Sequence, residues 1–370
     1  MDPATLEHLL LREIRKSPGI SRRDLAQRLE VARSTAGRRV DSMIGTGAVE
    51  EIGIEYTAEA GRPKRQLKLR GDYGSFIGFD FDARNIYGVL VDFAQSTLEK
   101  IKVSLTERPS KDEVIEHLKK AIGHFSNTRQ GNLHGIGLGI PGPVRQKERI
   151  AVDYPYISGW KNVKLCDELG FGPEILRIEH NTKAMALGEY WLEKTASVEN
   201  LICINVRTGI SAAIISDGHL IRGAHEIAGE IGGWSSKGPE NTNPKPEWLE
   251  NRATIRAIFP RSIATPEAWA DFVESCQRED RKALQQLSIM ASYHGDTVAR
   301  LTQLVDPEIV VFAGAFNEIG NPYLEQIRQA TARALLGHFV APPPIRFVSQ
   351  GEFSGAQGAA ALSAMHFKPY

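Results

Sequence analysis

Two observations predict an α/β protein with a separate winged helix-turn-helix at its N-terminus. Residues 73–370 alternate short apolar strands with helices, a pattern typical of α/β folds built around a mixed sheet. Residues 1–72 instead show three short helical patterns followed by two alternating strands, which is the order of a winged helix-turn-helix.

Charge is divided unevenly between these two parts. Residues 1–70 hold 14 Lys or Arg against 10 Asp or Glu, a net charge of +4, whereas the rest of the chain carries −4. The basic excess is concentrated between Arg12 and Arg39. It favours a nucleic acid as partner, although charge alone is equally consistent with a solvated helical surface.

Composition and motifs argue against a membrane or secreted protein. No apolar run approaches the roughly 18 residues that span a bilayer. The first ten residues lack the cationic start and small-residue cleavage site of a signal peptide. The three cysteines, Cys166, Cys203 and Cys276, are too widely spaced for a disulfide framework or a Cys-rich zinc site. We therefore expect a cytoplasmic protein.

The N-terminal elements follow from apolar spacing and helix-end residues. Apolar residues at helical spacing between Leu6 and Ile14 predict the first helix, which Ser17-Pro18-Gly19 ends. Ser21 with Asp24 three residues later predicts a capping box and a second helix to about Leu29. A third helix is expected over 34–44, and the strands of the wing over 49–54 and 66–69.

The third predicted helix has the side chains of a DNA recognition helix. Hydroxylated and cationic residues at its N-terminus can bond phosphate oxygens or reach base edges in the major groove. In the wing, the extended segment Gly61–Arg65 either enters a minor groove with Arg62 leading or is a basic turn. The predicted DNA contacts are Ser21, Arg22, Arg33, Ser34, Thr35, Arg38, Arg39, Arg62, Lys64 and Arg65. The alternative for residues 1–72 is a three-helix module that docks a protein.

The remaining chain is expected to contain strands and helices in alternation. Strands are predicted over 76–80, 86–92, 136–140, 175–178, 201–206, 211–215, 309–312 and 345–348. Helices are predicted over 111–125, 183–191, 266–276, 281–305 and 355–365.

Six motifs in this region carry a resemblance to a known family. They are GFDFDARNIYGVLVD, GIGLGIPGPV, IEHNTKAMALGEYW, GAHEIAGEIGG, DPEIVVFAGAF and GAQGAAAL. In order and spacing they resemble the ROK family (repressors, open reading frames and sugar kinases) from about residue 75 to the end. The resemblance implies a two-lobed actin-like ATPase fold. The first lobe would span 73–195 and the second 196–340, with a return strand and helix over 341–370 packing on the first lobe.

The residues that perform phosphoryl transfer in ROK kinases are altered here. The family's first phosphate turn resembles Asp-x-Gly-x-Thr, but Asp82 stands at the Gly position, where a carboxylate repels phosphate. The family's catalytic Asp corresponds to Asn181, whose carboxamide is no useful proton acceptor. The second phosphate turn keeps one glycine of three, Gly209. We therefore expect no sugar kinase activity and no bound cofactor.

The resemblance also implies which residues contact a sugar. Glu230 matches a family glutamate that hydrogen-bonds sugar hydroxyls, and Glu250 keeps the position of a second. His180, Asn181 and Lys183 complete the predicted ligand site, and Lys183 suggests an acidic or phosphorylated ligand. The alternative for both glutamates is helix capping or a salt bridge.

The family's structural zinc site is missing from this sequence. Its four ligands are one His and three Cys, but the corresponding stretch from Gly232 to Glu250 holds neither residue type. We therefore expect no metal, with Trp248 packing in its place.

Together the two parts resemble a ROK transcriptional repressor of the type that controls sugar uptake and amino-sugar metabolism. The expected partners are a double-stranded DNA operator, a sugar or phosphosugar effector and a second copy of the chain, because a palindrome needs two-fold symmetry. One alternative is an ATP-dependent sugar kinase with an added DNA-binding domain. Another is a ligand-independent regulator that uses the ROK fold as a dimerisation scaffold.

Overall fold

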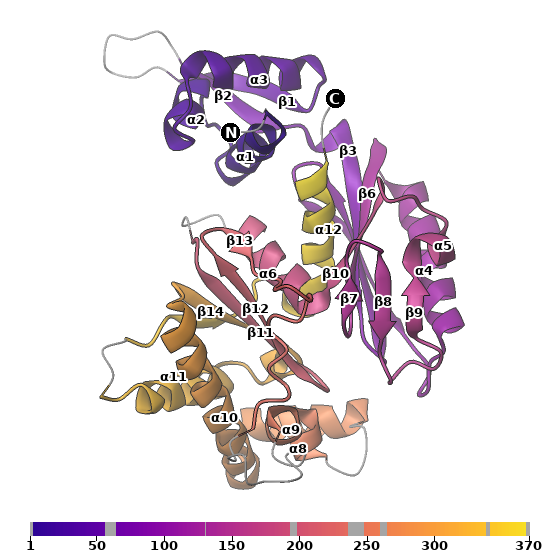
Figure 1. Ribbon diagram of the computed structural model, residues 1–370, viewed down its shortest axis with the longest axis vertical. Helices are drawn as coiled ribbons and strands as arrows, with labels where there is room; N and C mark the ends of the chain where they lie inside the picture. Colours follow the sequence, from indigo (N-terminus) through magenta and orange to yellow (C-terminus); the bar gives the residue numbers. More distant parts are fainter. Residues whose placement is uncertain are drawn as a thin grey trace. The chain divides into compact units, whose positions relative to one another are not determined.

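The computed structural model describes residues 3–55, 64–129, 131–192, 198–235, 248–259, 265–337 and 341–367. It divides into two compact units (Figure 1). The first contains Met1–Ala184, Trp191–Ala196 and Gly355–Tyr370. The second contains Met185–Tyr190 and Ser197–Ser354.

The predicted winged helix-turn-helix is confirmed. Its helices are α1 (Pro3–Lys16), α2 (Arg22–Arg28) and α3 (Arg33–Gly45), followed by the antiparallel strands β1 (Val49–Glu55) and β2 (Lys64–Leu69). The capping box at Ser21 is also confirmed, since its hydroxyl accepts from the N–H of Asp24 and the Asp24 carboxylate accepts from the N–H of Ser21. Residues from all three helices and β2 form the core, among them Leu10, Ile14, Leu25, Val40 and Leu67.

The first unit also contains a five-stranded mixed sheet, as expected for an α/β fold. Its order is β10-β6-β3-β4-β5, in which β10, β6 and β3 are parallel and the other neighbours antiparallel. The strands are β3 (Gly74–Phe81), β4 (Asn85–Asp92), β5 (Thr97–Ser104), β6 (Asn132–Ile140) and β10 (Leu176–His180). The sequence patterns did not predict β5, because this edge strand has no fully buried side chain.

Helices and a smaller sheet complete the first unit. The short 3-10 helix η1 (Gly71–Tyr73) leads from the wing into β3. Helix α4 (Lys111–Thr128) contributes Val114, Leu118 and Phe125 to the same core as β3 and β6. A three-stranded sheet comprises β7 (Val144–Arg145), β8 (Ile150–Asp153) and β9 (Lys161–Lys164), followed by α5 (Leu165–Leu169).

Helix α12 (Ser354–His366) lies directly against β3 and β6, as Figure 1 shows. A Cβ at Gly78 of β3 would overlap the carbonyl of Ala356, and one at Gly137 of β6 would overlap the carbonyl of Ala359. The small residues of the last predicted helix and these two glycines therefore permit close helix–sheet packing.

The second unit is built on another five-stranded mixed sheet, of order β13-β12-β11-β14-β15. Its strands are β11 (Leu201–Val206), β12 (Ile210–Ser216), β13 (His219–Leu220), β14 (Ile309–Gly314) and β15 (Ile345–Phe347). Its helices are α7 (Leu249–Arg252), α8 (Ile255–Ile258), α9 (Pro266–Gln277), α10 (Arg281–Val305) and α11 (Asn321–Ala334), with the 3-10 helices η3 (Ala315–Ile319) and η4 (Gly351–Phe353).

The return to the first unit begins later than the sequence predicted. The expected boundary was residue 341, but β15 pairs in parallel with β14 in the second unit's sheet. Only the segment from Gly355 onward belongs to the first unit. Within the described ranges, none of the helices is both long and apolar enough to cross a membrane.

Candidate DNA-binding and effector sites

The predicted recognition helix α3 presents cationic and hydroxylated side chains to solvent. Arg33, Ser34 and Arg38 are exposed, whereas Ala36 and Val40 are buried. Thr35 is half-buried. The helix thus packs through its apolar face, and its opposite face is available for a DNA groove.

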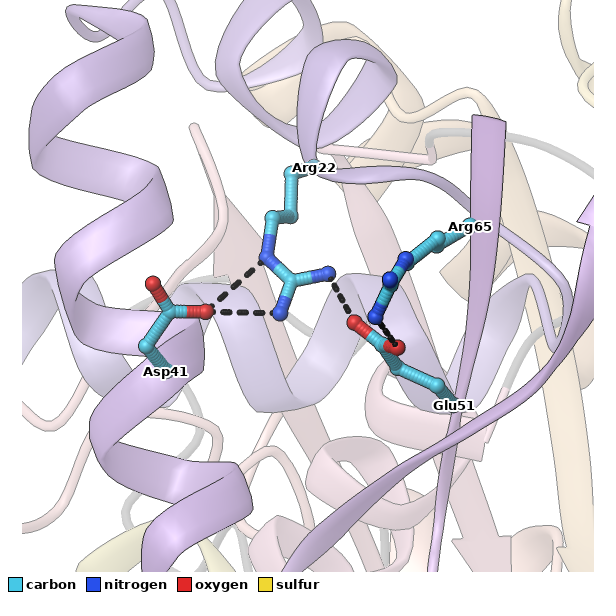
Figure 2. Close-up of polar contacts among 4 residues, drawn as sticks. All are labelled: Arg22, Asp41, Glu51 and Arg65. Atoms are coloured by element: carbon cyan, nitrogen blue, oxygen red, sulfur yellow. Dashed lines mark hydrogen bonds and ion pairs between the residues drawn. The ribbon is translucent and has the colours of Figure 1, made fainter. Parts of the chain in front are cut away.

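Two of the predicted DNA contacts belong to an ion-pair network within the domain (Figure 2). Arg22 of α2 lies 2.6 Å from the carboxylate of Asp41 in α3 and 2.7 Å from that of Glu51 in β1. Arg65 of β2 lies 2.6 Å from the other oxygen of Glu51. Burial raises the pKa of Glu51, but hydrogen bonds from both arginines outweigh it, so this pKa lies below its ordinary value. The network joins α2, α3 and both strands of the wing.

Other predicted contacts also have internal partners. Ser21 is buried and caps α2. Arg39 lies 3.0 Å from the buried carboxylate of Glu7, which ties α3 to α1. Arg62 and the side chain of Lys64 lie outside the described residues. The DNA role of every residue in the predicted set stays a prediction, and Arg33, Ser34 and Arg38 have the exposure that base or phosphate contacts require.

A candidate ligand site lies at one edge of the first sheet. Strands β3, β6 and β10 are parallel, so their carboxyl ends meet at this edge. Asp80 of β3 and Glu179 of β10 both pair with Gly139 of β6, which places two buried carboxylates in one row on either side of a glycine. Glu179 accepts a 3.0 Å hydrogen bond from the Gln146 amide. The sequence motifs did not single out Glu179 as a ligand residue, although an acidic residue near the end of a buried strand is a usable signal.

His180 and Asn181 follow at the same edge, where β10 ends and α6 (Asn181–Leu192) begins. Burial, with a further contribution from the charge of Lys183, lowers the pKa of His180 to about 3. The imidazole is therefore neutral near pH 7 and offers one donor and one acceptor. The Asn181 carbonyl oxygen accepts from the N–H of Thr182 at 2.8 Å. Lys183 is buried in the same first turn.

The turn between β3 and β4 is closed by its own carboxylate. The Asp82 side chain accepts from the N–H of Arg84 at 2.7 Å and from that of Asn85 at 3.0 Å. The Asp82 N–H in turn donates to the carbonyl of Asn85 at 3.1 Å. The N–H groups of Arg84 and Asn85, which could otherwise bind an anion, are thus already bonded to the Asp82 carboxylate.

The second unit holds the other predicted ligand residues. Glu250 lies beside the altered phosphate turn, since a Cβ at Gly209 would be 3.6 Å from its carboxylate. It pairs with Arg256 at 3.2 Å, and burial raises its pKa. Glu230 is exposed and follows Gly229, whose left-handed φ of 92° lets the chain pass close to Ala212. The ligand roles of both glutamates, and of His180, Asn181 and Lys183, stay predictions.

The described residues contain no group of three or more His, Cys, Asp or Glu arranged to hold a metal ion. Most of the stretch that corresponds to the family's zinc segment, residues 236–247, lies outside the described part.

Fold and site together define a class of protein: a winged helix-turn-helix joined to an α/β body with two five-stranded mixed sheets and a polar sheet edge. The chain belongs to the ROK family, whose model matches residues 76–365. Residues 5–50 match the winged helix-turn-helix DNA-binding domain.

Relatives include both regulators and enzymes. The xylose repressor of Caldicellulosiruptor bescii is 26% identical over 359 residues, which cover 90% of this chain and 88% of that protein. A solved ROK family transcriptional regulator, a homologue of the E. coli MLC protein, is 19% identical with a TM-score of 0.76 and covers 99% of this chain and 98% of its own. A ROK glucokinase from Streptomyces griseus, solved with glucose and AMPPNP, is 25% identical with a TM-score of 0.66, covering 78% of this chain and 99% of its own.

Proposed function

We propose that this protein is a transcriptional repressor whose ROK body senses a sugar and controls operator binding. One chain contains both a winged helix-turn-helix and a ROK body, and the recognition helix of the former is cationic and exposed. This combination carries the proposal. The full-length similarity to a xylose repressor supports the same reading.

We also propose that the ROK body has no kinase activity. Phosphoryl transfer needs a cradle for the nucleotide phosphates and a base for the attacking hydroxyl. The carboxylate of Asp82 accepts from two N–H groups of the first turn and would repel phosphate. Asn181 stands at the position of the base, and its side-chain oxygen accepts a hydrogen bond from the N–H of Thr182. Both features support binding without chemistry.

The chemistry of the sheet edge supports a sugar as the effector. Neutral His180 and the carboxylates of Asp80 and Glu179 are groups that hydrogen-bond hydroxyls. Lys183 would favour an acidic or phosphorylated sugar. D-xylose is the first candidate because of the named relative.

We further propose a cytoplasmic homodimer that reads a palindromic operator. Two recognition helices related by two-fold symmetry fit two successive major grooves on one side of the duplex.

Two measurements test the proposal on the full-length protein. Selection from a random DNA pool should recover a palindromic operator. Thermal unfolding with D-xylose, D-glucose, N-acetylglucosamine and their phosphates, each with and without Mg-ATP, should show one sugar class stabilising the protein. A sugar at a hundred times its Kd adds ~2.7 kcal/mol, which is easily detected.

The outcomes separate the candidate functions. A sugar shift without an ATP effect, together with weaker operator binding, supports the sugar-sensing repressor. A shift by ATP and formation of a phosphosugar would establish the kinase instead. Operator binding without any ligand shift would leave a DNA-binding regulator whose ROK body is a scaffold.

A further inference from the structure

Helix α6 is divided between the two compact units. Asn181 at its start and Trp191 at its end belong to the first unit, and Met185–Tyr190 between them belongs to the second. Within the second unit, Tyr190 packs in the core formed with β11 and β12, and Glu189 accepts a 2.7 Å hydrogen bond from Arg346. The helix is continuous from Asn181, at the candidate ligand site, to Trp191 near its other end.

The last turn of α6 contacts the DNA-binding domain. The guanidinium carbon of Arg15, in the last turn of α1, lies 4.4 Å from the centroid of the Trp191 ring, a cation–π distance. Trp191 is buried. A second contact close by joins His8 of α1 to the carbonyl of Phe367, just after α12, at 3.0 Å.

Several buried polar atoms at this junction have no hydrogen-bond partner among the described protein groups. Nε and Nη2 of Arg15, both amide atoms of Gln95 and Nε1 of Trp191 have no hydrogen-bond partner in the described part of the chain. The three side chains line a cavity of about 20 Å³, room for a single water molecule. Burial lowers the pKa of Arg15 to about 9, so the guanidinium remains charged at pH 7.

Buried polar groups without protein partners cost free energy unless water satisfies them, and this cavity has room for one water molecule. The cation–π contact and apolar neighbours such as Leu11 and Phe76 offset part of that cost. A ligand that binds one position of α6 more tightly than another therefore biases this contact.

We infer that α6 carries the effector signal to the DNA-binding domain through the contact between Arg15 and Trp191. The inference rests on the proposed function, since it names how the same ligand site regulates operator binding. A ligand that displaces Asn181 moves one end of this continuous helix. The displacement reaches Trp191, which lies ten residues or roughly 15 Å along the helix from Asn181.

The first experiment needs neither sugar nor DNA. Amide hydrogen exchange is measured on full-length wild type, Arg15→Leu and, as matched control, Lys16→Leu, which changes the neighbouring residue of the same helix. Arg15→Leu should change the exchange rates at the start of α6, around Asn181, by about threefold or more. Lys16→Leu should leave them as in wild type.

The second experiment measures the coupling itself. Affinity for the selected operator is determined with and without D-xylose, or whichever tested sugar stabilises the protein, in wild type, Trp191→Leu and Trp191→Phe. In Trp191→Leu, sugar should change operator affinity at least fivefold less than it does in wild type. Sugar should still raise the unfolding temperature of this variant. Trp191→Phe keeps an aromatic face and should retain most of the ratio.

Two results would overturn the inference. One is unchanged exchange around Asn181 in Arg15→Leu while exchange in α1 rises, because the contact would then exist without transmitting anything. The other is a Trp191→Leu variant whose operator affinities with and without sugar have the same ratio as in wild type. Failure to select any operator or to find any sugar refutes parts of the proposed function instead, and the exchange experiment still decides the inference.

Discussion

At the scale of single residues, charge on the recognition helix does not by itself identify a DNA contact. Arg38 and Arg39 are neighbours with the same side chain, yet Arg38 is exposed and Arg39 lies 3.0 Å from the buried carboxylate of Glu7. The fold therefore predicts different roles for them, operator recognition for Arg38 and stabilisation of the domain for Arg39.

Alanine substitutions should separate these roles. Arg38→Ala should weaken operator binding by ~1–3 kcal/mol if the side chain makes a bidentate base contact, with little change in stability. Arg39→Ala should lower the free energy of unfolding by ~1–3 kcal/mol, because it removes a charge-assisted hydrogen bond to a buried group. Fluorescence anisotropy with labelled operator and urea unfolding measure the two quantities. Equal losses of operator affinity in both variants would contradict the assignment.

His294 of α10 is a buried histidine whose protonation should limit stability in acid. It donates from Nε2 to the carbonyl of Ala253 at 2.7 Å, while its Nδ1 and the Tyr323 hydroxyl lie 2.8 Å apart. Burial lowers its pKa from 6.5 to about 4. Between these values the unfolded chain binds the proton more strongly, so stability falls as the pH drops below about 6.5.

This single group should remove about 2 kcal/mol of stability between pH 7 and pH 5. Urea unfolding at the two pH values measures the loss. In His294→Gln, which cannot titrate, the difference between the two pH values should shrink by that amount, whatever the absolute stability of the variant. The same pH dependence in both proteins would show that His294 is not the group responsible.

At the scale of elements, a glycine lowers stability on an exposed helix face but permits close packing at a helix–sheet contact. Gly123 lies on the exposed face of α4 with nothing within 4 Å of its missing Cβ. Gly137 of β6 lies where a Cβ would overlap the backbone of α12 at Ala359.

Replacing each glycine by alanine should therefore change stability in opposite directions. Gly123→Ala should raise the free energy of unfolding by about 0.5–1 kcal/mol, because alanine loses less conformational entropy in a helix. Gly137→Ala should lower it by about 1–3 kcal/mol, since α12 must move away from the sheet. Chemical denaturation of both variants tests this, and a neutral Gly137→Ala would show that α12 packs more loosely.

At the scale of the whole molecule, the proposed homodimer fixes the geometry of its operator. Two readers related by two-fold symmetry must meet half-sites on the same side of the duplex. Insertion of about 5 base pairs at the centre of the selected operator turns one half-site to the opposite side and should weaken binding by about tenfold or more. Insertion of about 10 base pairs should recover part of the loss. Mobility-shift titrations measure this series, and affinities independent of spacing would argue against a dimer that reads both half-sites.

The sequence by itself determined the local structure and the family. Apolar spacing identified α1, α3 and α10, and the Ser21–Asp24 pair identified a helix start, because periodicity and capping depend on residues close together in the chain. Motifs that keep their order identified the ROK family and exposed the substitutions Asp82 and Asn181. Strand β5 was missed because only Ile101 and Val103 alternate with polar residues in it, and this period is too short to mark a strand.

Only the tertiary structure decided which side chains meet. Arg22 and Arg65 read as DNA contacts in the sequence, but packing of the wing on α2 gives them Glu51 as a common partner. The contact of Arg15 with Trp191 joins residues 176 positions apart, and no local pattern marks either one. Local signals report which face of an element is buried, whereas partners at long range are chosen by how the elements pack.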